Sequence, residues 1–419
     1  MGCKVNFCDT ETILQTFKDA GYEIVQFAQK ADVYVINTCT VTNTGDGKSR
    51  RLISRARRNN HEAIVAAVGC YTQLNSAEIA DLGADIIMGT RNREKLVDYV
   101  LNYRHGSQTL DLTDFDGDEH FDSIFVGGNS GRTRTFLKIQ DGCDNFCAYC
   151  IVPYARGRSR SRPVNDILQQ ARTFAENGYR EIVICGIHIA SFGNDLQGWD
   201  LLGIIQAISE IDGIERIRLS SLEPRVITKD FVAGIRNSKV CPHFHLPLQS
   251  GSDAVLAWMG RRYTTADYSR AVEILREAIP DVGITSDIIT GFPGESDENF
   301  VQSAEFIREM QLSGLHVFPY SAKKGTAAAE FLEQVPHQIK AARAKELLAI
   351  DKELSQNFAK QFLGRKMPIL VEGQGRDGKM MGKTGNYIGV SYDGEKADIG
   401  RILEVELVRL EENGIHAQI

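Results

Sequence analysis

The chain has 419 residues, with 48 Lys and Arg against 55 Asp and Glu, a net charge of −7 and 42% hydrophobic residues. This length suggests two to three domains, and the ordinary hydrophobic and charged fractions exclude disordered, collagen-like and coiled-coil proteins. No apolar stretch reaches the roughly 18 residues that cross a bilayer, and the start of the chain lacks a signal peptide, so we expect a cytoplasmic protein with no membrane partner. In that compartment the nine cysteines are better suited to ligands, catalysts or buried residues than to disulfides.

The first part of the chain, residues 1–105, alternates short apolar runs with helical patterns. This alternation predicts an α/β domain with a doubly wound parallel sheet. The expected strands are 32–37, 63–68 and 84–88, and the expected helices are 11–20, 49–58, 76–82 and 93–103. A further strand should end at Cys3, so either that strand is missing or the native start lies upstream of Met1.

Residues 106–131 are rich in Gly, Asp and Ser and predict a linker. Residues 132–363 again alternate strands and helices, which predicts a partial (β/α)6 barrel rather than a full eight-unit one. Its expected strands are 134–140, 181–186, 214–220, 243–249, 284–289 and 315–320, and a long helix over 337–363 closes it.

The last segment, 364–419, changes character. Three apolar runs, at 367–373, 386–392 and 401–410, are separated by Gly and Asp turns and predict a small all-β module. Because its charge is nearly balanced, RNA binding there would depend on a local face or on stacking, with Tyr387 and Tyr392 as candidates.

Cys143, Cys147 and Cys150 form a C-x3-C-x2-C motif directly after the first predicted barrel strand. Iron–sulfur clusters normally take four cysteines, so three thiolates on one loop would leave one iron with an open position. An open position distinguishes a catalytic metal site from a structural one. A zinc site with a distant fourth ligand, and chance, are the alternatives.

Cys3, Cys39 and Cys70 form a second set, because each follows a predicted strand of the first domain. The carboxyl ends of parallel strands share one edge of a sheet, where ligands bind, so we expect these thiols to converge. The alternative is three unrelated buried cysteines.

Three cysteines remain outside these sets. Cys185 lies inside an apolar strand and Cys241 near the start of another, and both are predicted to be buried core residues. Cys8 is predicted to be an ordinary free cysteine, with an exchangeable or protective thiol as the less favoured alternative.

Two basic runs follow the cysteines of the two sets. Such runs are usually solvated faces, but this position at the rim of a site favours contact with RNA phosphates. The candidate RNA-binding residues are Lys48, Arg50, Arg51, Arg55, Arg57 and Arg58 in the first run, and Arg156, Arg158, Arg160 and Arg162 in the second.

Together these features resemble the radical S-adenosylmethionine (SAM) superfamily, and within it the methylthiotransferases, which end in a small β module called TRAM. The matching stretches cover essentially the whole chain in order. They are GCKVN (2–6), NTCTVT (37–42), VGCY (68–71), GCDNFCAYCIVPYARGRSRSR (142–162), SSLEP (220–224), HLPLQSGS (245–252), MGRRYT (259–264) and DIITGFPGE (287–295). The GCKVN opening is similar to the branch that modifies threonylcarbamoyladenosine in tRNA.

The resemblance implies that Cys143, Cys147 and Cys150 hold a [4Fe–4S] cluster that binds and cleaves SAM. It implies that Cys3, Cys39 and Cys70 hold an auxiliary [4Fe–4S] cluster that delivers sulfur. A second SAM would supply the methyl group, and the product would carry a methylthio group on C2 of the adenine at position 37 of tRNA. The expected SAM-contacting residues are Tyr149, Gly186, His188, Glu223 and Gln249.

The expected partners are the anticodon stem-loop of tRNA and a small electron donor such as a flavodoxin or ferredoxin, while the source of sulfur is left open. The same chemistry on isopentenyladenosine of tRNA, or on an aspartate of a small-subunit ribosomal protein, is the alternative within the family. A zinc-dependent RNA-binding module without catalysis is the alternative of a different class.

Overall fold

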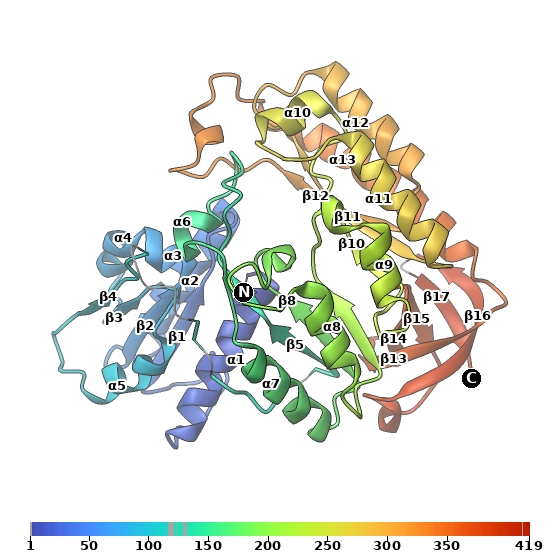
Figure 1. Ribbon diagram of the computed structural model, residues 1–419. Coiled ribbons are helices and arrows are strands. Elements are labelled where there is room, and N and C mark those ends of the chain that lie inside the picture. The colour runs from blue at the N-terminus through green and yellow to red at the C-terminus, as the bar shows by residue number, and fades with distance from the viewer. Residues whose placement is uncertain (1, 116–120, 123, 129–131, 413) are drawn as a thin grey trace.

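The structure is a computed structural model that describes residues 2–115, 121–122, 124–128, 132–412 and 414–419. Its N-terminal part is a four-stranded parallel sheet whose strands lie side by side in chain order (Figure 1). The strands are β1 (Val33–Thr38), β2 (Ile64–Gly69), β3 (Ile86–Met88) and β4 (Thr109–Asp111). The first three confirm the predicted strands, whereas β4 comes from the segment that was predicted to be a linker.

Helices cover both faces of this sheet, as expected for a doubly wound arrangement. The helices are α1 (Lys4–Asp19), α2 (Asn43–Asn59), α3 (Cys70–Leu74), α4 (Ser76–Asp81), the 3-10 helix η1 (Arg93–Lys95) and α5 (Leu96–Leu101). α1 and α5 pack with Ala66 and Val68 of β2, while α2 and α4 pack with Val65 and Ala67 of the same strand. Successive residues of a strand point to opposite faces, so these two clusters lie on opposite sides of the sheet.

The start of α1 differs from the prediction. The helix begins at Lys4 rather than at residue 11, and Cys3 is its N-cap, with Sγ accepting a hydrogen bond from the Asn6 amide at 3.4 Å. Only Gly2 precedes Cys3 among the described residues, so the expected strand before Cys3 stays a prediction. Val5, Ile13 and Phe17 are buried at a helical spacing, and this buried face requires a helix through the first residues.

The central part contains the six predicted parallel strands in two sheets of three (Figure 1). They are β5 (Arg134–Lys138), β8 (Glu181–Cys185), β9 (Arg216–Leu219), β10 (His243–His245), β11 (Gly283–Thr290) and β12 (Gly314–Pro319). A parallel bridge between Ile217 and Val240 joins the two sheets, and no pairing among the described residues closes β12 onto β5. The six strands therefore form an open, partial barrel.

Helices on the outside of this barrel bury its apolar side, and the alternate residues of the strands face the interior. Helix packing buries Ile182 and Ile184 of β8, so Glu181 of the same strand belongs to the interior side. The outer helices are α7 (Val164–Glu176), α8 (Leu201–Ser209), α9 (Lys229–Ile235), α11 (Thr265–Ala278), α12 (Asp297–Met310) and α13 (His337–Lys360). Short elements between them are β6 (Gln140–Asp141), α6 (Val152–Arg156), β7 (Arg160–Ser161), η2 (Ile189–Ser191), η3 (Pro224–Val226), α10 (Asp253–Trp258) and η4 (Ala327–Glu330).

The C-terminal part is a closed β-barrel in the order β13-β14-β15-β17-β16. Its elements are β13 (Lys366–Gln374), β14 (Met380–Thr384), β15 (Gly389–Tyr392), η5 (Lys396–Asp398), β16 (Ile402–Glu411) and β17 (Gly414–Gln418). The all-β prediction is confirmed, although only three of the five strands were expected. Tyr392 is fully buried in this barrel, and Tyr387 stacks on His243 at 4.5 Å, so neither tyrosine is free to stack on a base as expected.

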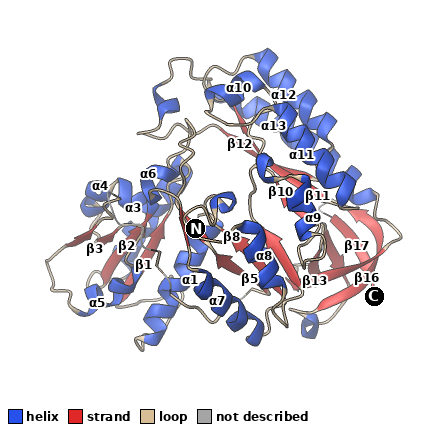
Figure 2. Cartoon of the chain, viewed as in Figure 1, coloured by secondary structure: helices blue, strands red, loops and turns tan. Residues whose placement is uncertain are grey.

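Both flanking parts are docked on the central barrel, and Figure 2 shows the strand groups side by side. Phe7 of α1 packs edge-on against Phe136 of β5, with ring centroids 5.4 Å apart. Arg218 of β9 bonds Glu181 at 3.0 Å and donates to the Gly385 carbonyl of the C-terminal barrel at 3.1 Å. Among the described residues, no helix combines the length and the apolar composition needed to cross a bilayer.

Candidate active site

The three N-terminal cysteines converge at one edge of the parallel sheet. Cys39 directly follows β1 and Cys70 directly follows β2, as predicted, while Cys3 reaches the same edge from the start of α1. Burial, together with the negative charges of ionised Cys3 and Cys39, raises the pKa of Cys70 to about 11. The three thiols therefore lie within electrostatic range of one another.

Two asparagines join the start of α1 to the end of β1. Asn6 Nδ2 donates to Asn37 Oδ1 at 2.8 Å and to the Thr38 carbonyl at 3.0 Å, and Asn37 Nδ2 donates to the Asn6 carbonyl at 2.9 Å. Gly69, at the end of β2, has a φ of +99°, and a Cβ there would lie 2.5 Å from Asn37 Oδ1. Any side chain at position 69 would collide with Asn37, so glycine is required where the chain turns from β2 directly into Cys70.

A fully buried cation, Arg156, lies beside this set. Its guanidinium donates to Asp9 at 2.8 Å and to both oxygens of Asp141 at 3.1 Å. Burial raises the pKa of the Cys3 and Cys70 thiols, and the Arg156 charge opposes that rise. A positive group at this position favours thiolates, the form in which cysteine binds metals.

The predicted role of the second basic run is contradicted for three of its four arginines, because they are buried. Arg156 is 1% exposed, Arg160 is 4% exposed and donates to Asp141 at 3.2 Å, and Arg162 is 5% exposed. Burial lowers the pKa of Arg162 to about 10. Buried guanidinium groups cannot reach RNA phosphates, so Arg158, whose side chain is 65% exposed, is the one member of this run that faces solvent.

The second cysteine set lies on the loop between β6 and α6. Cys147 is buried, and Cys143 and Cys150 are half-buried. Burial raises the pKa of Cys143, and it raises the pKa of Cys150 to about 12; the negative charge of ionised Cys147 contributes to both rises. These three thiols are therefore neighbours as well.

Arg261 is a residue of this site that the sequence analysis missed. Its Nη1 donates to Cys147 Sγ at 3.3 Å, and the neighbouring Met259 carbonyl accepts from the Ala148 amide at 2.9 Å. The MGRRYT stretch matched the family, but nothing in the sequence indicated that it would lie against a loop more than a hundred residues earlier. A cation on a ligand sulfur stabilises the thiolate.

Both sets fit a [4Fe–4S] cluster by the chemistry of their donors. All nine cysteines are free, and each set offers three of them. In such a cluster each cysteine binds a different iron, so the sulfur atoms surround the cluster and need not meet at one point. A closed structural zinc site would need a fourth protein ligand in each set.

The two sets are adjacent. α6 begins two residues after Cys150 and packs against α3, which begins with Cys70. The Thr90 hydroxyl donates to the Ala155 carbonyl of α6 at 2.9 Å and fixes this contact. Groups bound at the two sets would therefore face a common space.

Two of the predicted SAM-contacting residues form a polar group with a residue of the cysteine loop. His188 Nε2 lies 3.2 Å from Glu223 Oε2, and Asn145 Nδ2 lies 3.5 Å from the same oxygen. Burial raises the pKa of Glu223, but hydrogen bonds from His188 and Arg225 lower it to about 2. Glu223 is therefore an anion at the carboxyl end of its strand, where barrel enzymes bind their ligands. Asn145 and Arg225 were not predicted.

The other three predicted residues lie at different places in the barrel. A Cβ on Gly186 would lie 2.8 Å from Gln140 Oε1, which accepts from the His188 amide at 2.8 Å, so Gly186 permits that contact. Tyr149 packs edge-on against Phe292 at 6.5 Å, on the apolar side of the cysteine loop. Gln249 has a φ of +67° and donates its amide to the Asp287 carbonyl at 2.8 Å.

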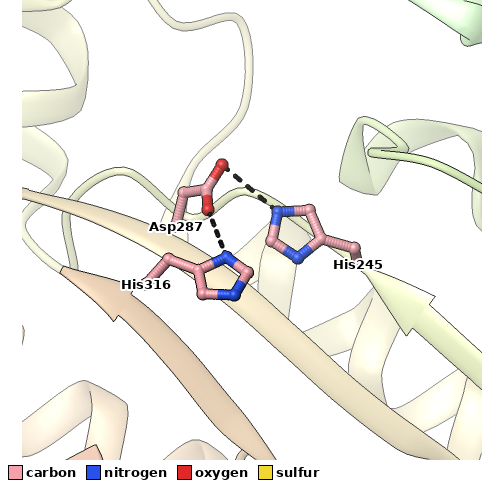
Figure 3. A group of neighbouring side chains, drawn as sticks. All are labelled: His245, Asp287 and His316. Atoms are coloured by element: carbon pink, nitrogen blue, oxygen red, sulfur yellow. Dashed lines mark hydrogen bonds and ion pairs between the residues drawn. The ribbon is translucent and has the colours of Figure 1, made fainter. Parts of the chain in front are cut away.

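A histidine–aspartate–histidine group spans β10, β11 and β12 (Figure 3). Asp287 accepts from His245 Nε2 at 3.2 Å and from His316 Nδ1 at 3.1 Å, and His245 Nδ1 lies 2.9 Å from the Thr285 hydroxyl. These are the donor types of a two-histidine, one-carboxylate metal site, and their ligand atoms lie within 4.8 Å of one another. Both carboxylate oxygens already accept from a histidine, so hydrogen bonding alone satisfies the group.

The first basic run contains an exposed face and two residues that also bond within the N-terminal part. Arg57 bonds Asp85 and the Gly83 and Ala63 carbonyls, and Arg50 donates to the Tyr71 hydroxyl at 2.7 Å, so both have structural contacts and their contact with RNA stays a prediction. Four side chains line one exposed groove along α2 at helical spacing: Lys48, Arg51, Arg55 and Arg58.

The three remaining cysteines are buried. Cys185 and Cys241 are 0% and 3% exposed, which confirms the prediction of core residues. Cys8 Sγ lies 3.5 Å from Cys185 Sγ, so this thiol joins α1 to the barrel strand β8. Burial of the thiol and its hydrogen bond with Cys185 both raise the pKa of Cys8, which makes it an unreactive packing residue.

An open parallel barrel with a three-cysteine loop at its mouth defines a radical SAM protein. Residues 137–307 match the sequence model of the radical SAM superfamily, 1–89 match the uncharacterized protein family UPF0004, and 360–419 match the TRAM domain. The fold is similar to that of the radical SAM methyltransferase TsrM from Kitasatospora setae, with a TM-score of 0.56 at 15% identity over 74% of this chain and 71% of that one.

Relatives that match over the full length show which family of radical SAM proteins the chain belongs to. The chain is 40% identical to the threonylcarbamoyladenosine tRNA methylthiotransferase MtaB of Bacillus subtilis, over 98% of this chain and 92% of the relative. It is 34% identical to the tRNA-2-methylthio-N6-dimethylallyladenosine synthase of Clostridium tetani, over 97% and 92%. The chain belongs to the radical SAM tRNA methylthiotransferase family, in its MtaB-like group.

Proposed function

We propose that this protein places a methylthio group on C2 of N6-threonylcarbamoyladenosine at position 37 of tRNA. The observation that carries the proposal is the pair of adjacent three-cysteine sets, in a chain that is 40% identical to a relative named for this substrate. Family membership alone leaves the substrate open, because relatives named for dimethylallyladenosine also match over the full length.

The proposed cofactors are two [4Fe–4S] clusters and SAM. Bound at the two cysteine sets, they would supply an electron for SAM cleavage and a sulfur atom for transfer, chemistry that side chains cannot provide. Cys143, Cys147 and Cys150 would hold one cluster, with Arg261 bonded to Cys147. Cys3, Cys39 and Cys70 would hold the other, with Arg156 as the buried counter-charge.

The protein's polar side chains would orient SAM and exclude alternative poses. His188, Asn145 and Glu223 form a fixed group beside the cysteine loop, and the Glu223 carboxylate can accept hydrogen bonds from an ammonium or a ribose. The proposed RNA contact is the exposed groove of α2, which lies on the helix that follows Cys39. A flavodoxin- or ferredoxin-type protein is the proposed electron donor.

Metal content and product identity test the proposal. Anaerobic reconstitution should load about eight iron atoms per chain, and about four in Cys39→Ala or Cys147→Ala variants. Cys147→Ala should abolish SAM cleavage, whereas Cys39→Ala should retain SAM cleavage but transfer no sulfur. Mass spectrometry of tRNA nucleosides from cells with and without the gene should identify the methylthiolated threonylcarbamoyladenosine.

Other outcomes point to the alternatives. Zinc as the only bound metal would establish the non-catalytic RNA-binding module. A methylthiolated dimethylallyladenosine, or a modified aspartate in a ribosomal protein, would replace the substrate while keeping the chemistry. Unimpaired sulfur transfer by Cys39→Ala would refute the role of the N-terminal set.

A further inference from the structure

One cation next to the N-terminal cysteine set is exposed. Lys4 follows Cys3 directly and is exposed at the first position of α1. Three other cations, Arg93, Lys138 and Arg156, all bind the carboxylate of Asp9 on the same helix, at 3.1, 2.8 and 2.8 Å. Among the described residues, none forms an ion pair or a hydrogen bond with the Lys4 ammonium, so this charge is available to a ligand.

The Lys4 charge acts on the barrel interior. The hydrogen bond to Asp287 raises the pKa of His316, and the nearby charge of Lys4 opposes this rise. Burial lowers the pKa of His243, and the Lys4 charge lowers it further. These histidines lie on β10 and β12, so the charge of Lys4, a residue directly after Cys3, is near enough to act on both strands.

The two kinds of relatives differ in one chemical group. Their substrates carry either a threonylcarbamoyl or a dimethylallyl substituent on N6 of adenine. The first ends in a carboxylate and the second is purely apolar. C2 and N6 lie on the same edge of the adenine, on either side of N1. A base with C2 at the N-terminal cysteine set therefore holds its N6 substituent next to the residues that flank this set.

We propose that Lys4 binds the carboxylate of the threonylcarbamoyl group and thereby selects this substrate over dimethylallyladenosine. This inference rests on the proposed function. A carboxylate that leaves water for an enclosed site requires a charged partner, and an ammonium offers three donors on a flexible stem. A dimethylallyl group would leave the ammonium desolvated and unpaired, which disfavours its binding.

The test compares Lys4→Met with the wild type in the full-length, reconstituted protein. The matched control is Lys18→Met, which removes an exposed lysine from the last turn of the same helix. The ligands are an anticodon stem-loop RNA with threonylcarbamoyladenosine and the same RNA with the neutral amide of that group. Dissociation constants and kcat/KM are measured for each pair, together with iron content.

Lys4→Met should weaken binding of the carboxylate RNA and lower its kcat/KM by about 10- to 100-fold, mainly through KM. The amide RNA should bind the variant and the wild type equally, Lys4→Arg should restore part of the loss, and iron content should stay unchanged. Equal losses for both RNAs, no loss for either, or loss of iron would overturn the inference. If the wild type leaves the threonylcarbamoyladenosine RNA unmodified, the proposed function itself fails, and this result is obtained from the wild type alone.

Discussion

Arg156 was expected to contact RNA, and it instead joins Asp9 of α1 to Asp141 of β6 in the interior. The sequence shows that Arg156 belongs to a run of arginines at every second position, with Arg158, Arg160 and Arg162. A period of two is also what a short strand produces, and Arg160 indeed lies in β7. The charge pattern could not reveal that the surrounding carboxylates bury this run, because those carboxylates come from distant segments.

Replacing Arg156 with Met should destabilise the apoprotein by roughly 3–5 kcal/mol, because two buried carboxylates lose a shared cation. Urea unfolding followed by circular dichroism measures this change. Arg158→Met, at an exposed position, is the control and should change stability by less than about 1 kcal/mol. Retained stability with a loss of RNA affinity in Arg156→Met would restore the original interpretation.

Asp9 makes the stability depend on acid pH. Burial raises the pKa of Asp9, but the charges of Arg93, Lys138 and Arg156 lower it to about 2, below the ordinary value of about 3.9 in an unfolded chain. A depressed carboxyl pKa contributes stability that is present above pH 4 and is lost as the pH falls toward 2. Unfolding free energies of wild type and Asp9→Asn between pH 6 and 3 should show a shallower acid loss in the variant, by about 1 kcal/mol. Parallel curves would contradict this assignment.

At the scale of elements, α2 carries its exposed basic side chains along one face of the helix. Reversing Arg55 and Arg58 to Glu should weaken tRNA binding and reduce the salt dependence by about one unit per lost phosphate contact. Arg172→Glu on α7, exposed on another helix, is the matched control. Unchanged affinity and salt slope in the double variant would mean that this groove does not face RNA.

Elements made of apolar runs or of helically spaced apolar residues were predictable, and strands without such a pattern were not. The six barrel strands and the helix α13 follow from apolar runs and helical spacing. β4 and β14 are short and contain Asp, Lys or Gly, so their extended conformation comes from pairing with neighbours rather than from local preference.

The cysteine sets were predictable from their spacing and their positions near strand ends. The supporting residues were not, because Arg261 and Asn145 act through contacts that form only in the fold. Cys3 illustrates both cases. Its convergence with Cys39 and Cys70 was expected. The sequence did not indicate that Cys3 lies at the start of a helix, which hydrogen bonds between Asn6 and Asn37 fix to the end of β1.

At the scale of the whole molecule, Arg218 connects the central barrel to the C-terminal barrel. It bonds Glu181 and the Gly385 carbonyl, and it lies 4.7 Å from the Tyr387 ring centroid. Arg218→Met should lower stability by about 3 kcal/mol and make the C-terminal barrel more sensitive to limited proteolysis. Arg180→Met, which breaks an exposed ion pair with Glu215, is the control. Equal proteolysis of both variants would show that this contact does not hold the barrel in place.

Three cations share the carboxylate of Asp9, and this limits how the protein can be divided into separately expressed fragments. Two of its three cations, Lys138 and Arg156, come from the central part of the chain. A fragment that ends after β4 would keep Asp9 with Arg93 alone and would expose the face of α1 that packs on Phe136. Truncated pieces expressed separately would therefore each carry unbalanced buried charge, and mixing them should not rebuild the enzyme. The N-terminal and central parts are therefore needed together for the N-terminal cysteine set to have its native surroundings.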